Sequence, residues 1–305
     1  MKSAGALKHR CNRKGCQAYI SPTHGHPVFG KLGRGVTASS SLNEQASVLF
    51  CIVAGATNVV AHRILDKNHK MIEDISRKLD AARRVVVERD QKRIMFGQLM
   101  TWNDVEGDEV DLGKEDVGAV DKKKPAQTMR WEQWQGLVER GDRRTLVLSK
   151  TNAKMTKRRA PGPGPLRKAD WMPIANTYLK KRRVILHTDG AKSYRLKTSP
   201  VEGILHDWVV HKPKKVVKGK TSVWYKPKYV TLVKHNLPDG TTVMAKAGTQ
   251  LIDRAWAFIR KHIGSRASHI GESSFRDRIR SAQWCYWNQG EDLWKATGDM
   301  LKSLP

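Results

Sequence analysis

The stretch Val184 to Tyr194, with the sequence Val-Ile-Leu-His-Thr-Asp-Gly-Ala-Lys-Ser-Tyr, decides how the rest of the chain is interpreted. Three β-preferring apolar residues lead to Asp189, and Gly190 then allows the chain to turn. The acid is therefore predicted at the end of a buried strand, facing a cleft. Taken alone, the stretch is also compatible with an Asp that starts a turn or caps a helix.

The composition indicates the kind of partner rather than the fold. The 305 residues include 57 Lys and Arg against 29 Asp and Glu, a net charge of +28. A phosphate backbone or an anionic membrane is the usual counterpart of such a charge. The longest apolar run, Val48 to Ala56, is much shorter than the roughly 18 residues of a membrane-spanning helix. Nucleic acid is therefore the expected partner, and binding to a membrane is not expected.

The N-terminal segment is basic, and its first acid is Glu44. Transit peptides share this composition. Cys11 and Cys16, followed by His24 and His26, could instead offer two thiolates and two imidazoles to zinc. The spacing of the Cys pair is wider than that of a usual zinc ribbon, and no second pair follows. Residues 1–40 are interpreted as a degenerate zinc ribbon or basic arm, with Cys11 and Cys16 as the zinc ligands. Four cysteines at scattered spacing indicate a reducing compartment.

Residues 41–97 have a helical pattern. Ser41 and Glu44 have the spacing of a capping box, and a second short helix is predicted around residues 59–65. Asp66 or Asn68 is predicted to cap a longer, basic helix. Its apolar stripe consists of Ile72, Ile75 and Leu79.

Three compact helices with a basic last member are typical of a helix-turn-helix. Lys70 would lie near the start of the recognition helix and contact DNA. A small helical bundle that binds no DNA is an equal alternative.

Acids are concentrated between Asp104 and Asp121, where eight of them accompany one Lys. Residues 105–112 fit a strand on which Asp108 points to the same side as Val110 and Leu112. Carboxylates on a half-buried strand repel one another unless a cation holds them. A solvated acidic loop is the alternative.

Residues 136–141 and 145–148 are predicted to form a hairpin beside the Asp108 strand. Residues 150–183 then carry eleven basic residues and one acid, interrupted by Pro-Gly-Pro-Gly-Pro at 161–165. That run is incompatible with a helix or a central strand, so the segment around 154–168 is predicted to be an exposed loop. Its candidate DNA contacts are Lys154, Lys157, Arg158 and Arg159. A helix from about 169 to 181 leads into the Asp189 strand.

After a further strand at 204–210, residues 212–234 contain eight Lys and no acid, interleaved with Trp224, Tyr225 and Tyr229. Basic residues that alternate with aromatic ones suit a groove for single strands or distorted DNA ends. A solvent-exposed hairpin with its turn at 238–240 is the alternative, and both can hold. The candidate DNA contacts are Lys214, Lys215, Lys218 and Lys220.

Residues 248–261 are predicted to form a helix with one apolar face, made of Ile252, Trp256 and Ile259. Asp253 and Arg260 lie seven residues apart and share the adjacent face. An acid and a base two turns apart could serve a metal and a phosphate, although an ion-rich surface would have the same pattern. A last helix is predicted at about 275–287.

Four motifs, in this order, resemble those of the DDE transposases of insertion sequences, the ISXO-type group. They are Val-Glu-Gly-Asp-Glu at 105–109, Gly-Leu-Val-Glu-Arg-Gly at 136–141, Leu-His-Thr-Asp-Gly-Ala-Lys-Ser-Tyr at 186–194 and Gly-Thr-Gln-Leu-Ile-Asp-Arg-Ala-Trp at 248–256. The resemblance implies an RNase H-like fold in which three acids bind two divalent metal ions, Mg²⁺ or Mn²⁺. It assigns these roles to Asp108, Asp189 and Asp253, with Arg260 where the family has a Lys.

The chain also departs from the family pattern. The third acid is Asp where Glu is expected, and Gly248 and Gln250 replace the usual His and Asn of that motif. Residues 212–247 look like an added hairpin, and the first Cys pair of a full zinc ribbon is missing. These departures bear on catalytic competence more than on the fold.

The sequence therefore predicts an α/β (α+β) protein. A zinc knuckle comes first, and a helix-turn-helix-like region follows at 41–97. An RNase H-like mixed sheet flanked by helices then spans 98–290, and a tail at 291–305 follows it. The implied activity is cleavage of transposon ends and strand transfer into target DNA by a homo-oligomer bound to double-stranded DNA. Localisation would follow the genomic DNA. The alternatives are a transposase-derived DNA-binding protein that does not cut and an RNase H-like nuclease.

Overall fold

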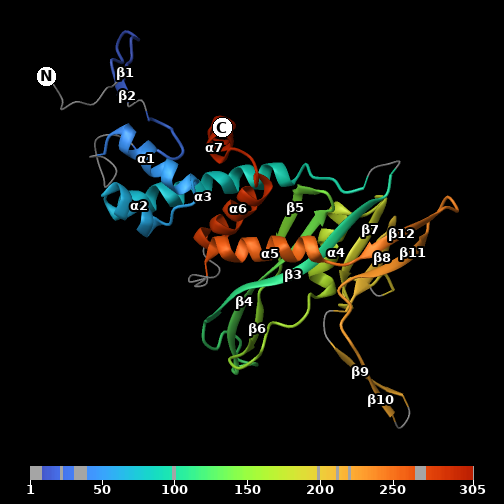
Figure 1. The fold of residues 1–305 in the computed structure, drawn as a ribbon. Coiled ribbons are helices and arrows are strands. Elements are labelled where there is room, and N and C mark those ends of the chain that lie inside the picture. The colour runs from blue at the N-terminus through green and yellow to red at the C-terminus, as the bar shows by residue number, and fades with distance from the viewer. Residues whose placement is uncertain are drawn as a thin grey trace. The chain divides into compact units, whose positions relative to one another are not determined.

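The computed structural model describes residues 9–20, 23–30, 40–97, 101–197, 200–210, 213–218, 221–264 and 273–304. The chain divides into two compact units, and Figure 1 shows the elements of each. One unit consists of Met1–Glu88 and Arg276–Pro305, and the other of Arg89–Phe275. None of the described helices is long and apolar enough to cross a membrane.

The first unit is mainly helical. It begins with a small hairpin of β1 (His9–Arg10) and β2 (Tyr19–Ile20). Its helices are α1 (Leu42–Val53), α2 (Asn58–Leu65), most of α3 (His69–Gln91), most of α6 (Ser273–Trp287) and α7 (Leu293–Lys302). The predicted apolar stripe of α3 is confirmed, because Ile72, Ile75 and Leu79 are all fully buried. Helix α7 occupies the segment for which the sequence predicted only a tail.

Side chains close in sequence start the first helices. The hydroxyl of Ser41 accepts from the backbone N–H of Glu44, whose carboxylate accepts from the N–H of Ser41, so the predicted capping box is present. At the start of α3, Asn68 Oδ1 accepts from the N–H of Lys70. Asp66 instead ends α2 in the left-handed conformation, with a φ of 48°. Of the two caps predicted for α3, Asn68 is therefore the one that acts.

The second unit is built on a six-stranded mixed sheet of order β5-β4-β3-β7-β8, with β6 also paired to β4. The strands are β3 (Asn103–Asp116), β4 (Gln127–Glu139), β5 (Asp142–Lys150), β6 (Lys154–Lys157), β7 (Val184–Asp189) and β8 (Ile204–Val209). β3, β4 and β5 are antiparallel neighbours, whereas β7 is parallel to β3 and β8 is parallel to β7. The prediction of a mixed sheet flanked by helices is confirmed. β6 was not predicted, and the basic segment thus begins as a strand rather than as an exposed loop.

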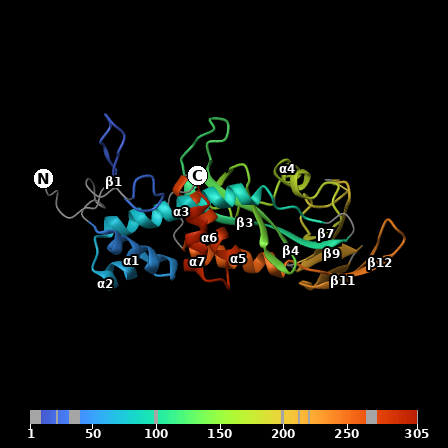
Figure 2. The ribbon, with the colours of Figure 1, turned by 90° about the horizontal axis from the view of Figure 1, so that it is seen from above.

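Helices α4 (Lys168–Tyr178) and α5 (Gln250–Ile263) lie on opposite sides of this sheet (Figure 2). The α4 side is an apolar core in which Trp171 packs with Leu186 and Leu137. On the α5 side, the predicted apolar face of the helix is buried. Gly136 of β4 makes room for it, since a Cβ at that position would lie 2.7 Å from the ring of Trp256.

Residues 212–247, predicted to form one hairpin, contain two. β9 (Lys214–Lys218) pairs with β10 (Thr221–Tyr225), and β11 (Thr231–Asn236) pairs with β12 (Thr242–Ala247). The predicted turn at 238–240 belongs to the second, where Gly240 has a φ of 83°. Figure 1 shows β9 and β10 projecting away from the sheet.

Candidate functional site

Asp108 and Asp189 lie on neighbouring strands and on one face of the sheet. Glu106 of β3 is in register with His187 of β7, and the two acids follow two residues further along each strand. Because side chains alternate along a strand, all four residues point to the same side. That side is covered by α5, whose first backbone N–H groups bind Glu106.

Asp253 lies in the first turn of α5, which packs against β3 and β4. Its side chain is exposed, and its Oδ2 accepts a hydrogen bond of 3.2 Å from the hydroxyl of Thr249. Arg260, also on α5, is exposed. Burial raises the pKa of Asp111, and the positive charge of Arg260 is one of the smaller effects that oppose this rise. The three acids named from the sequence thus come from two adjacent strands and from the helix laid against them.

The other two acids influence the pKa of Asp108. Burial raises the pKa of Asp108 well above its ordinary value, and the negative charges of Glu109, Asp189 and Asp253 raise it further. Within the described ranges, no three His, Cys, Asp or Glu side chains are grouped so as to hold one metal ion. The charges of the three acids therefore influence one another, but among the described residues their carboxylates do not form a metal-binding group.

A buried tyrosine links two of the sequence motifs. Glu109 follows Asp108 and points to the opposite face, where its carboxylate accepts from the hydroxyl of Tyr194 at 2.6 Å and from the N–H of Leu166 at 3.1 Å. Tyr194 is fully buried, and burial raises its pKa well above the ordinary value. The bond connects the strand of Asp108 to the turn that follows Asp189. The spacing of the motifs alone did not indicate it.

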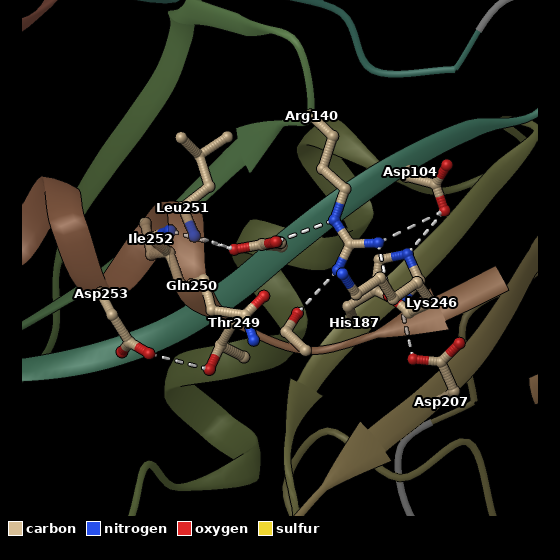
Figure 3. Close-up of polar contacts among 12 residues, drawn as sticks. Asp104, Arg140, His187, Asp207, Lys246, Thr249, Gln250, Leu251, Ile252 and Asp253 are labelled. Carbon is tan, nitrogen blue, oxygen red and sulfur yellow. Dashed lines mark hydrogen bonds and ion pairs between the residues drawn. The ribbon is translucent and has the colours of Figure 1, made fainter. Parts of the chain in front are cut away.

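A chain of histidines and carboxylates lies on the α5 side of the sheet, and Figure 3 shows its members Asp104, His187 and Asp207. His187 Nε2 lies 2.7 Å from Asp104 Oδ1, and His187 Nδ1 lies 2.6 Å from Asp207 Oδ1. The other oxygen of Asp207 lies 2.9 Å from Nε2 of His235 in β11. Burial opposes a charge on His187, but the bonds to Asp104 and Asp207 outweigh it and raise the pKa of the imidazole.

This chain of polar residues was not predicted from the sequence. A histidine within the apolar run of β7 was the available signal, because a buried imidazole requires partners. The partners themselves lie on strands far away in sequence.

The basic residues named from the sequence occupy different environments. Lys157, Arg158 and Arg159 are exposed in and just after β6, and Lys70 is exposed near the start of α3. Lys154 is only 7% exposed, and its ammonium donates to the carbonyls of Gly164 and Pro165. It therefore holds the Pro/Gly loop in place rather than offering a free charge.

In the projecting hairpin, Lys215 is exposed and its ammonium lies 5.9 Å from the ring centroid of Trp224. Lys214 and Lys218 are described only as positions in β9, whereas Lys220 lies outside the described residues. Trp224 is 63% exposed, so its ring is accessible to a partner.

The candidate zinc ligands lie in and after the small N-terminal hairpin. A hydrogen bond from the backbone of Ala18 lowers the pKa of Cys16, and a second from the thiol of Cys11 lowers it further, so the two sulfurs are neighbours. His26 Nδ1 accepts from the N–H groups of Val28 and Phe29. His24 is exposed.

Comparisons with protein-family models, with curated proteins and with solved structures found no match to this chain.

Proposed function

We propose that the chain is a DDE-type DNA transposase, which cleaves the ends of a mobile element and joins them to target DNA in a metal-dependent reaction. The observation that carries this proposal is the placement of three acids from three separate motifs. Asp108 and Asp189 share one face of two adjacent strands, and Asp253 lies on the helix that packs over this face. A helix-turn-helix role for α2 and α3, with Lys70 at the start of α3, forms part of the same proposal.

The kind of donor atom that the three acids carry supports the proposal. Its donors are carboxylate oxygens, the ligands that suit Mg²⁺ and Mn²⁺. Burial raises the pKa of Asp108 and the charges of its acidic neighbours raise it further, and a bound cation would offset that repulsion. Asp108, Asp189 and Asp253 would hold the metal, and bound divalent ions would supply an activated water and stabilise the oxygens of an in-line displacement at phosphorus.

The protein's own groups bind and orient the DNA. Arg260 lies on α5, seven residues after Asp253, and can hold a phosphate of the strand that is cut. The exposed Lys157, Arg158 and Arg159 extend the positive surface. No covalent protein nucleophile is required for this reaction class.

If the positive surface of Lys157, Arg158 and Arg159 binds DNA electrostatically, the affinity should depend on salt. Affinity for generic duplex should fall steeply with salt, and replacing Lys157, Arg158 and Arg159 by Gln should reduce the slope of log K against log salt by up to about 3, roughly 0.9 for each lost phosphate contact. Binding curves at several salt concentrations measure both slopes. A salt response that does not differ between the two proteins would exclude this segment from the DNA interface.

The activity itself is tested by nicking of supercoiled plasmid that carries the element's ends. The wild-type chain should nick the plasmid with Mg²⁺ and should stop on addition of a chelator, whereas Asp189→Asn should bind DNA normally without nicking. Joining of a free 3′-hydroxyl end to a target plasmid then distinguishes a transposase from an RNase H-like nuclease.

A DNA-binding protein derived from a transposase is the second candidate. It is favoured by the third acid, which is an exposed Asp with a side chain one methylene shorter than the Glu of the family. Salt-dependent DNA binding without metal-dependent nicking would identify that function.

A further inference from the structure

Helix α5 lacks the local cap with which most helices begin. Its N-cap residue, Thr249, makes no side-chain capping bond. The hydroxyl of Thr249 binds Asp253 Oδ2 instead, at 3.2 Å. The first N–H groups of the helix therefore need an acceptor from elsewhere, since unpaired groups at a buried helix end are costly.

Glu106 of β3 provides this acceptor. One carboxylate oxygen, Oε2, accepts from the N–H of Leu251 at 2.7 Å and from the N–H of Ile252 at 3.1 Å. Its side chain is only 3% exposed, and a buried anion at a helix N-terminus also gains from the helix dipole. The start of α5 is thus fixed to the strand that carries Asp108, two residues further along.

Arg140 fixes the other oxygen of the same carboxylate. Its Nε donates to Glu106 Oε1 at 2.8 Å, and its terminal nitrogens donate to the carbonyls of Lys246 and Gly248 at 2.6 and 2.9 Å. The first carbonyl belongs to the end of β12, and the second lies between β12 and α5 (Figure 3). Glu106 and Arg140 together therefore hold both the helix start and the chain that enters it.

We infer that Glu106, supported by Arg140, is a positioning residue that sets where Asp253 stands relative to Asp108 and Asp189. The inference rests on the proposed function for its consequence in metal binding. Because Asp253 is shorter than the family's Glu, its reach depends on the placement of α5. A cap supplied by β3 fixes that placement to the strand of the first acid. Glu106 itself points its oxygens at backbone N–H groups and at Arg140.

The test compares Glu106→Gln with Glu132→Gln in the full chain. Glu132 is a matched control because it is also a buried carboxylate of this sheet, 5% exposed and paired with Lys150 at 2.8 Å. Glu106→Gln should raise the Mg²⁺ concentration for half-maximal nicking by at least about 10-fold, the lower range for loss of an outer partner of a metal ligand. It should also speed hydrogen exchange of the Leu251 and Ile252 amides, while DNA affinity stays unchanged.

Glu132→Gln should leave both the Mg²⁺ requirement and those two amides as in the wild type. Arg140→Gln, which loosens Glu106 without removing it, should shift both readouts in the same direction and carries the test if Glu106→Gln does not fold. Unchanged Mg²⁺ dependence in both Glu106→Gln and Arg140→Gln, next to an active wild type, would overturn the inference. A wild type that does not nick would count against the proposed function, and the amide exchange would then still show whether Glu106 holds α5.

Discussion

Two carboxylates on opposite sides of one sheet have opposite surroundings. Asp170, at the start of α4, accepts hydrogen bonds from the backbone and side-chain nitrogens of Asn152 and from Arg167. Burial alone would raise the pKa of Asp170, but these bonds lower it below its ordinary value. The chain itself supplies everything that this charge requires.

The pKa of Asp108, on the α5 side, is instead affected by other acids. Burial raises its pKa, and the charges of Glu109, Asp189 and Asp253 raise it further. A buried carboxylate with a structural role accepts hydrogen bonds from donors around it. A buried carboxylate that other negative charges repel must instead take up a proton or a cation. The difference separates the side of the sheet that holds the fold together from the side that carries the candidate site.

The largest expected effect concerns the α5 side. Asp253→Asn should reduce metal-dependent nicking by at least about 100-fold, because loss of a ligand should cost no less than loss of its outer partner. Asp253→Glu restores the family's longer side chain and should keep or raise the activity. Single-turnover nicking rates of both variants measure this, and a wild-type rate in Asp253→Asn would show that Asp253 is not a metal ligand.

Substitutions on the α4 side of the sheet should change the stability of the fold rather than the nicking activity. Leu186→Ala removes a fully buried side chain from the core and should lower the free energy of unfolding by about 2–5 kcal/mol. Leu232→Ala is the control, because Leu232 is 70% exposed. Urea unfolding of both variants measures the difference, and a Leu186→Ala protein as stable as the control would show that this side is not the core.

A smaller loss of stability is expected where α5 meets β4. Gly136→Ala places a Cβ 2.7 Å from the ring of Trp256 and should cost about 1–3 kcal/mol through overpacking. Gly162→Ala is a suitable control, since its nearest contact would be 3.9 Å away. If thermal unfolding did not distinguish the two variants, α5 would not pack closely on β4.

The smallest effect is expected at Asp170, and it should depend on pH. Because the pKa of Asp170 is lowered in the folded state, its contribution is present above its unfolded pKa of about 3.9 and is lost as the pH falls through the folded value. Asp170→Asn should therefore cost about 1–2 kcal/mol at pH 7 and progressively less below pH 4. Urea unfolding at several pH values would show that the difference in unfolding free energy between the wild type and Asp170→Asn becomes smaller as the pH falls. A constant difference would mean that the charge of Asp170 contributes nothing.

Features set by neighbours in sequence could be predicted, and features set by distant partners could not. The capping box of α1 and the apolar faces of α3 and α5 follow from local spacing, and the structure has them. The residue that caps α5, Glu106, lies 145 residues before Leu251 in the sequence, so patterns of neighbouring residues could not predict it. Lys154 looked like a loop cation, but pairing of β6 with β4 buries it.

If Asp108 belongs to a cation site, thermal unfolding of the full chain should shift to higher temperature as the Mg²⁺ concentration rises. Metal bound to the folded state should stabilise the wild type by about 2.7 kcal/mol at 100 times the dissociation constant. Asp108→Asn should be at least as stable as the wild type without metal, because it removes a repelled charge, and should gain little from Mg²⁺. Equal stabilisation of both proteins by Mg²⁺, or none in the wild type, would contradict the account.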